Sequence, residues 1–329
     1  MRPHRSNFAR GYTLALLSAA VLSSTAILIR YLTQTFALPA LVLAFWRDAF
    51  VMLTLALVLA LGRPRLLRAS TRQRRYCLAY GLVLAVFNGM WTLAVALNGA
   101  AVATVLGYSS TAFAALLGWW LLKERLGWVK ILAVALSMAG CVLVSGALDP
   151  AAWRANALGI LTGTLSGLCF AFYSLMGSTA VKRGMNAWTT LLYTFGSAAG
   201  ILLLGNLLLG RWLPGAATRP ADMFWLGAAL DGWGVLFLLA AGPTVIGFGL
   251  YNLSLAHLPS SVANLITTLE PVFTTMIAYV LLDERLNGAQ VVGSVMILGA
   301  VVLMRVHKEK LTGHAVLKRK AQSRALLID

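Results

Sequence analysis

Long apolar runs alternate with short polar segments along almost the whole chain. A helix needs about 20 apolar residues to cross a bilayer core, and charges, glycines and prolines divide this chain into ten runs of roughly that length. The runs predict spans at Ala9–Leu32, Pro39–Leu61, Arg75–Leu97, Ala101–Leu121, Trp128–Ala147, Ala157–Thr179, Ala187–Leu209, Gly234–Ala256, Ser261–Leu281 and Gly288–Met304. A shorter stretch, Met223–Leu230, predicts an interfacial helix between spans seven and eight. The pattern therefore predicts an all-α polytopic membrane protein with ten transmembrane helices.

Composition agrees with this hydropathy pattern. Hydrophobic residues make up 60% of the 329 positions and charged residues 11%, whereas a soluble domain carries about 25% charged residues. Soluble cores stop growing at roughly 250–300 residues, so the apolar excess must face lipid. The first run follows Arg2, Arg5 and Arg10, as the core of a signal peptide would. Because nine further runs follow it, we expect an uncleaved first helix.

The formal net charge of +17 is distributed unevenly across the predicted membrane. With the amino terminus inside, 21 of the 27 Lys and Arg residues fall on the inner side or at inner helix ends, among them Arg63, Arg65, Arg68, Arg72, Arg74 and Arg75. This positive-inside bias predicts that both termini are cytoplasmic. The distribution argues against a nucleic-acid partner and predicts that the basic loops meet anionic membrane lipids.

Two distant segments are similar to each other. Leu116–Val144 and Thr275–Met304 share Leu-Leu-x-Glu-Arg-Leu between an apolar run and a Gly-studded apolar run, at an offset of 160 residues. Each half of the chain holds five spans, and an odd number inverts the second half in the membrane. We therefore expect two inverted five-helix repeats, residues 1–147 and 148–304, followed by a basic cytoplasmic tail, residues 305–329. Inverted repeats place a substrate site near the midplane, where the halves meet.

The duplicated Glu-Arg pairs lie at equivalent bends after spans four and nine, which the inversion places on opposite membrane faces. One interpretation is structural: Glu124 and Glu284 close tight turns and satisfy helix-end groups. The alternative is a ligand role for either carboxylate.

Several motifs together resemble the drug/metabolite transporter superfamily in its ten-helix EamA-type branch. They are Phe45-Trp46-Arg47, Leu122–Leu126, and Leu269-Glu270-Pro271-Val272 leading to Leu282-Asp283-Glu284-Arg285-Leu286, within the five-plus-five layout from Gly11 to Met304. The resemblance implies a helical transporter that moves small metabolites across the bacterial inner membrane, usually outward. Among family members, the chain looks most like the YddG-type exporters of aromatic and other amino acids.

The repeat breaks down at one informative place. Leu269-Glu270-Pro271 in span nine aligns with Ser109-Ser110-Thr111 in span four, so only one half carries the acid. Ionisable groups within spans are costly and are site candidates by default. Glu270 could bind a substrate ammonium or carry a proton, or it could be a buried acid that stabilises a kink at Pro271.

Arg47 and Asp48 are also charged residues inside a span. Adjacent helical residues point about 100° apart, which argues against simple pairing on one face. We expect Arg47 to snorkel outward or to clamp backbone carbonyls, with binding of a substrate carboxylate as the alternative.

Aromatic and amide residues predict a lined substrate cavity. Tyr80, Phe87, Asn88 and Trp91 share one face of span three. The remaining candidates are Tyr108, Ser109, Tyr173, Tyr251, Asn252, Asn264 and Glu270. Each fits ordinary interhelical packing singly, but they converge on spans one, three, four, six, eight and nine, which line the cavity in the resembling family. Tryptophans near span ends fit an interfacial belt: Trp119, Trp120, Trp128, Trp153, Trp188, Trp212 and Trp225.

Other chemistries lack their motifs in this sequence. There is no nucleotide-binding Gly-x-x-x-x-Gly-Lys loop, the four histidines lie outside the spans, and Cys77, Cys141 and Cys169 have neither metal-ligand spacing nor a disulfide framework. We expect no metal, no cofactor and no enzymatic activity. The expected function is secondary transport that exports amino acids or related small metabolites by alternating access. A facilitator or proton-coupled exporter of other neutral or cationic metabolites or drugs is the alternative, ahead of a membrane enzyme or scaffold; coupling ion and oligomeric state stay open.

Overall fold

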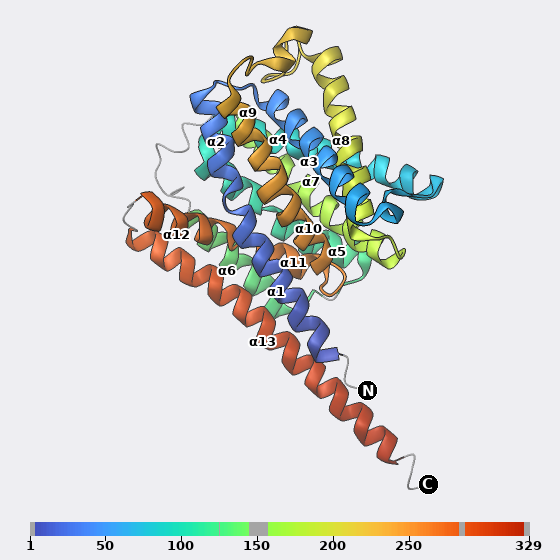
Figure 1. Ribbon diagram of the computed structural model, residues 1–329. Helices are drawn as coiled ribbons and strands as arrows, with labels where there is room; N and C mark the ends of the chain where they lie inside the picture. The colour runs from blue at the N-terminus through green and yellow to red at the C-terminus, as the bar shows by residue number, and fades with distance from the viewer. Residues whose placement is uncertain (1–3, 125, 145–156, 283–286, 326–329) are drawn as a thin grey trace.

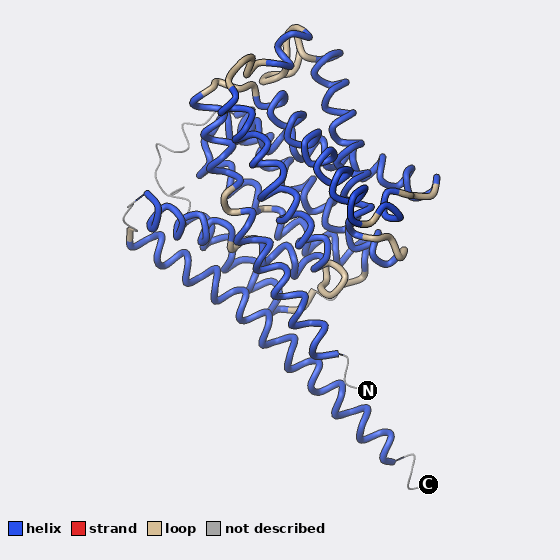
Figure 2. The backbone as a smooth tube through the Cα atoms, viewed as in Figure 1, coloured by secondary structure: helices blue, strands red, loops and turns tan. Residues whose placement is uncertain are grey.

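The fold is a bundle of helices (Figure 1). A computed structural model describes residues 4–124, 126–144, 157–282 and 287–325, and that part of the chain contains helices and loops without strands (Figure 2). In chain order the elements are α1 (His4–Leu22), α2 (Thr25–Thr35), α3 (Ala40–Gly62), η1 (Pro64–Leu67), α4 (Thr71–Tyr108), α5 (Ser110–Leu122), α6 (Trp128–Val144), α7 (Ala157–Lys182), α8 (Ala187–Leu209), η3 (Pro220–Phe224), α9 (Leu230–Leu239), η4 (Ala240–Thr244), α10 (Val245–Ser254), α11 (Ser260–Thr267), α12 (Glu270–Leu282) and α13 (Gly288–Ala325).

The prediction of an all-α polytopic membrane protein is confirmed. Among the described residues, eight helical segments are long and apolar enough to cross a membrane: Phe8–Thr35, Ala40–Gly62, Thr71–Leu97, Ala103–Leu122, Ala157–Lys182, Ala187–Leu209, Leu230–Ser254 and Gly288–His307. The shorter apolar helix α6 corresponds to the predicted fifth span, and α11 with α12 occupies the predicted ninth.

The equivalent helices of the two halves begin at equivalent positions. Helices α5 and α12 start at Ser110 and Glu270, which are 160 residues apart, and α6 and α13 start at Trp128 and Gly288 with the same offset. Helices α6 and α13 then run side by side (Figure 1). A Cβ at Gly140 would lie 2.7 Å from the Gly293 carbonyl oxygen, and a Cβ at Gly293 would lie 2.7 Å from that of Gly140. Glycine at both positions lets the two backbones approach, as in other membrane helix pairs.

Helix breaks divide three of the predicted spans, and a fourth span contains an irregular turn. The first divides into α1 and α2 at Ser23 and Ser24, whose hydroxyls donate to the carbonyl oxygens of Ala20 and Val21 and compete with the helical bonds. The fourth divides after Tyr108, and the ninth after Thr267. The eighth contains η4, a π-helical turn around Pro243.

Helix α4 also departs from the prediction. It continues through the expected turn between spans three and four. In a straight helix, residues 91 and 107 would lie about 24 Å apart, yet the Trp91 ring lies 2.8 Å from a Cβ built at Gly107. Helix α4 is therefore bent sharply between these two residues, in agreement with the separate candidate spans Thr71–Leu97 and Ala103–Leu122.

The predicted interfacial helix over Met223–Leu230 is wrong. A 3₁₀ helix, η3, ends at Phe224, turns follow, and Leu230 already begins α9. The reason is local capping. Pro220 opens η3, and Asp222 Oδ2 accepts from Thr218 Oγ1 at 2.7 Å and from the Arg219 N–H at 2.8 Å. These bonds fix a short turn where hydropathy alone indicated a longer helix.

The tail over residues 305–329 stays a prediction, and its described part is helical. Helix α13 continues from the tenth span to Ala325 and projects beyond the bundle (Figure 1). We call the end of the bundle that holds the beginnings of α1 and α11 and the end of α5 the terminal end. A Cβ at Gly11 in α1 would lie 2.7 Å from His257 Cβ, just before α11. The predicted residues Glu284 and Trp153 lie outside the described chain.

Candidate functional site

The interruptions of the first, fourth and ninth spans are linked to one another in the middle of the bundle. Tyr108, the last residue of α4, donates its hydroxyl to Glu270 Oε2 at 2.8 Å. Glu270 is the first residue of α12, and one turn later Thr274 Oγ1 lies 2.8 Å from the Ser23 carbonyl oxygen. The bond to Ser23 satisfies a carbonyl at the break in the first span. Residues from three interrupted spans therefore form one connected centre.

Glu270 keeps part of its surface accessible although it lies ten residues into the ninth span. The side chain is half-buried, while its partner Tyr108 is buried. Trp91 and Ser109 beside Tyr108 are also half-buried. These residues keep accessible surface although they contact neighbouring helices. A carboxylate at such a position requires a partner charge, a proton or water.

Small residues of α7 shape this centre. A Cβ at Gly167 would lie 2.5 Å from Ser109 Oγ and 3.0 Å from the Gly107 carbonyl oxygen, and one at Gly163 would lie 2.8 Å from Leu106 Cβ. Because α7 has no side chain at these positions, the end of α4 packs directly on its backbone. The Trp91 ring covers the other side of Gly107.

Buried polar side chains nearer the terminal end pair with one another in two neighbouring groups. In the first, Asn252 Nδ2 donates to Tyr173 Oη at 2.7 Å, and Tyr80 Oη donates to Asn252 Oδ1 at 3.4 Å. In the second, Tyr251 Oη bonds Ser174 Oγ at 2.6 Å, Asn264 Nδ2 donates to Ser174 Oγ at 3.0 Å, and Ser110 Oγ donates to Asn264 Oδ1 at 3.0 Å. The stacked rings of Tyr173 and Tyr251, with centroids 6.4 Å apart, join the two groups. All seven side chains are buried. We call Tyr80, Ser110, Tyr173, Ser174, Tyr251, Asn252 and Asn264 the closed network.

Tilted aromatic ring contacts join the closed network to half-buried phenylalanines. The Tyr80 and Tyr173 ring centroids are 4.7 Å apart, and Phe170 lies 5.5 Å from Tyr251 and 5.0 Å from Phe87. Phe87 and Phe170 are half-buried. The predicted residues thus divide into two layers: Phe87, Trp91, Ser109 and Glu270 with accessible surface, and the buried residues of the closed network below them.

Asn88 and Arg47 have other contacts than those predicted from the sequence. Asn88 Nδ2 donates to both carboxylate oxygens of Asp48 at 2.8 Å and is buried, so it fixes α4 to α3. Arg47 neither snorkels nor clamps a carbonyl. It is buried, and its Nε lies 3.5 Å from Asp48 Oδ1. A counter-charge this close offsets part of the cost of burying both charges.

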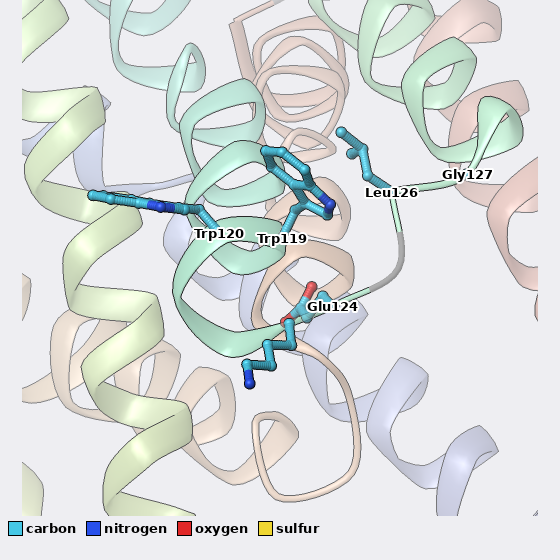
Figure 3. A pocket seen from close by; sticks show the side chains of 6 residues that line it. Trp119, Trp120, Glu124, Leu126 and Gly127 are labelled. Carbon is cyan, nitrogen blue, oxygen red and sulfur yellow. The ribbon is translucent and has the colours of Figure 1, made fainter.

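The interpretation in which Glu124 closes its turn and satisfies helix-end groups stays a prediction, and the structure gives its carboxylate three side-chain partners. Its Oε1 accepts from Ser260 Oγ at 3.0 Å, its Oε2 accepts from Ser261 Oγ, and Lys130 Nζ lies 3.0 Å from Oε2. Burial alone would raise the pKa of Glu124, but Lys130 and the hydroxyl donors together lower it below its ordinary value. Glu124 also borders a surface hollow with Trp119 and Trp120 (Figure 3). The carboxylate therefore stays charged at neutral pH and joins both halves.

Sequence reasoning missed several members of these clusters. Phe170 and Ser174 lie on the same face of α7 as Tyr173, at helical spacing, and this periodicity could have indicated them. Ser110 and Thr111 were noted only as the residues aligned with Glu270 and Pro271. Ser260 and Ser261 carried no sequence signal, because their contact with Glu124 is long-range.

The comparisons with known proteins agree with this architecture. The sequence profile described as the EamA-like transporter family matches twice, over residues 9–146 and 157–306. The chain is 25% identical to an uncharacterized transporter, YwfM, of Bacillus subtilis, over 92% of this chain and 97% of that protein. It is 26% identical to the uncharacterized transporter PA0485 of Pseudomonas aeruginosa, over 87% of this chain and 89% of that protein.

Two further matches are more distant or partial. An uncharacterized transporter of Synechocystis sp. is 23% identical over 69% of this chain, and the match spans 65% of that protein. A solved crystal structure is 18% identical, has a TM-score of 0.69, and covers 94% of this chain and 99% of its own; at that identity it supports the fold alone. The two profile matches together cover most of the sequence. This chain belongs to the EamA-like transporter family and is a multi-pass membrane transporter.

Proposed function

We propose that the chain exports amino acids, aromatic ones included, or related small metabolites across the bacterial inner membrane by alternating access. The observation that carries the proposal is Glu270, a half-buried carboxylate at the break in the ninth span, bonded to Tyr108 of the other half. A single carboxylate inside a membrane bundle suits a ligand that brings a positive charge. The α-ammonium of an amino acid is such a group.

Half-buried aromatic residues support an aromatic or apolar side chain on the substrate: Trp91 lies against Gly107, next to Tyr108, and Phe87 and Phe170 contact the aromatic rings of the closed network. Trp91, Phe87 and Phe170 are half-buried, and aromatic pairs favour offset or edge contacts with a further ring. A ring face also attracts a cation within about 6 Å. The centre therefore offers one anionic group and several ring faces to a small substrate.

The burial pattern supports a state that is closed at the terminal end. Every hydroxyl and amide of the closed network pairs within it, and its side chains are buried. The positive-inside distribution assigns the terminal end to the cytoplasm, with both termini inside. On that assignment residues 1–147 and 148–304 are the two moving repeats, residues 305–329 are a cytoplasmic tail, and this state is open or occluded toward the outside.

Flux into sealed liposomes tests the proposal. Purified protein is reconstituted and given a panel of labelled amino acids, with protein-free liposomes and Glu270→Leu as controls. We expect saturable uptake of at least one aromatic or aliphatic amino acid by the wild type alone. Uptake equal to protein-free liposomes for the whole panel would refute amino-acid transport. Repeating the assay with an imposed pH gradient separates a proton-coupled exporter, whose flux responds, from a facilitator, whose flux follows the substrate gradient.

A further inference from the structure

The strongest polar contact between the halves near the terminal end centres on Glu124. Ser260 and Ser261 are the first two residues of α11, in the second half, and both donate hydroxyls to the Glu124 carboxylate, in the first half. Both serines are buried, and Lys130 at the start of α6 is 8% exposed with its Nζ 3.0 Å from the same carboxylate. Three donors from two other helices therefore converge on one anion, and such charge-assisted bonds are the stronger kind.

The local backbone aims Glu124 at this contact. Helix α5 ends at Leu122, and Lys123 adopts a left-handed conformation with φ of 55°, which is unfavourable for a non-glycine residue. The turn brings the Glu124 N–H to the Gly118 carbonyl oxygen at 3.0 Å. It also lays the carboxylate over Gly118, where an added Cβ would lie 3.0 Å from Oε2. The absence of a side chain at Gly118 leaves room for the carboxylate.

At the positions equivalent by sequence, the acid is kept and the residues that partner it are changed. At the offset of 160 residues Glu124 aligns with Glu284, but Ser260 and Ser261 align with Ala100 and Ala101. In the same alignment Lys130 corresponds to Gln290 and Gly118 to Ala278. Alanine cannot donate to a carboxylate, and glutamine brings no charge. The sequence therefore provides these partners at one face of the bundle and omits them at the other.

The contact also lies where the cavity would have to open. Helix α5 begins at Ser110 and α11 ends at Thr267, next to the two interruptions in mid-span. Ser110 bonds Asn264 within the closed network, and Glu124 bonds Ser260 and Ser261 below it. Access from the terminal end requires α5 and α11 to separate, and the Glu124 bonds must break when they do.

We infer that Glu124, Lys130, Ser260 and Ser261 form a one-sided latch that holds the substrate cavity closed toward the cytoplasm. The inference rests on the proposed alternating access and adds its regulation: the resting equilibrium favours the state closed inside, because the outer equivalent lacks matching donors. A transporter built in this way exposes its empty site outward until the latch opens.

Accessibility of a central cysteine tests the latch without any substrate. Ser109→Cys is introduced in a background in which Cys77, Cys141 and Cys169 are replaced, and inside-out vesicles receive an impermeant maleimide on the cytoplasmic face. The double variant Ser260→Ala/Ser261→Ala removes the bonds between the halves and keeps the Lys130 pair. We expect its labelling rate to rise roughly tenfold, the factor that corresponds to about 1.4 kcal/mol. The matched control Glu284→Gln should label at the parent rate.

Two outcomes overturn the inference: a labelling rate within about twofold of the parent, or an equal rise in Glu284→Gln. Should the double variant fail to give monodisperse protein, Glu124→Gln replaces it as the test. This variant keeps the shape of the side chain and removes the negative charge to which Lys130 and the two serines donate. A rise with Glu124→Gln supports the latch, and an unchanged rate contradicts it. Because the readout is labelling, failure of amino-acid flux in liposomes would refute the proposed substrate and leave this result standing.

Discussion

The interrupted spans four and nine have the same backbone plan and different chemistry. In each, a helix stops in mid-membrane and a second helix begins at an equivalent position, Ser110 in one half and Glu270 in the other. The ninth span has Pro271 just after its break, which removes a helical donor. The fourth has no proline there and breaks all the same, with the Ser109 hydroxyl donating to the Leu106 carbonyl oxygen.

The comparison of these two breaks shows which feature is duplicated and which is not. Two breaks at equivalent positions belong to the repeated architecture, because they appear with and without proline. The carboxylate belongs to one half only, since its counterpart Ser110 donates to Asn264 and has no charge. The following predictions separate residues that maintain the common architecture from those that supply the chemistry of one half.

Tyr251 and Trp91 occupy aligned positions in the two halves, and we expect the largest stability effect at Tyr251. Tyr251 is 1% exposed and bonds Ser174, so Tyr251→Ala should destabilise the protein by about 3–5 kcal/mol. Trp91 is half-buried, and Trp91→Ala should reduce flux with a smaller loss of stability. Thermal unfolding in detergent measures the stability of both variants, and uptake into liposomes measures the flux. Equal stability losses would contradict the division into an accessible centre and a closed network.

Glu270→Gln should have the largest effect on transport. Removing one member of a buried charge pair costs about 2–5 kcal/mol, which corresponds to a loss of apparent substrate affinity of roughly 30-fold or more. The matched change in the other half, Ser110→Ala, should cost only about 1 kcal/mol, because Thr111 Oγ1 also lies 3.4 Å from Asn264 Oδ1. Concentration-dependent uptake into liposomes measures the two. Normal, still pH-dependent transport by Glu270→Gln would remove Glu270 from substrate and proton binding.

Tyr108→Phe should have an intermediate effect. It deletes the hydroxyl that donates to Glu270 at 2.8 Å, and hydrogen bonds to charged groups contribute about 1.5–3 kcal/mol. The control is Tyr80→Phe, which removes a longer bond of 3.4 Å to Asn252. We expect Tyr108→Phe to shift the apparent affinity and Tyr80→Phe to leave it nearly unchanged. A reversed order would place the substrate in the closed network.

Pro271→Ala should have the smallest effect. If the break in the ninth span belongs to the duplicated architecture, the helix stays broken without proline, and stability changes by less than about 1 kcal/mol. A proline that alone produced the break would cost about 3 kcal/mol as an interior helix residue, and its removal would change stability and flux together. Thermal unfolding and uptake of the variant distinguish the two cases.

Hydropathy sufficed for the helices and failed at their interruptions. The spans are set by apolar length, which is a local property, so the predicted boundary of α8 at Ala187–Leu209 agrees with the structure. The break at Ser23 depends on hydroxyl bonds to backbone carbonyls, and the turn at Asp222 depends on local capping. Hydropathy averages over such single bonds and therefore missed both.

Many residues of the candidate site could be predicted from the sequence, but the side chains with which they pair could not. Alignment and periodicity singled out Glu270 in span nine, Tyr108 in span four and Trp91 on one face of span three. Periodicity could not reveal that Asn88 pairs with Asp48, because that bond joins α4 to α3. The two serine donors to Glu124 likewise come from residues more than 130 positions away. Long-range pairing of polar groups requires the packed structure.

The account depends most on the two halves being inverted copies, and the sidedness of the duplicated turns tests this directly. Single cysteines are placed beside Glu124 and beside Glu284 in a background without native cysteines, and intact cells receive an impermeant maleimide. The inverted repeat predicts labelling beside Glu284 from outside and labelling beside Glu124 only after the membrane is opened. Labelling of both positions from the same side would contradict the inverted arrangement, and with it the comparison of the two broken spans.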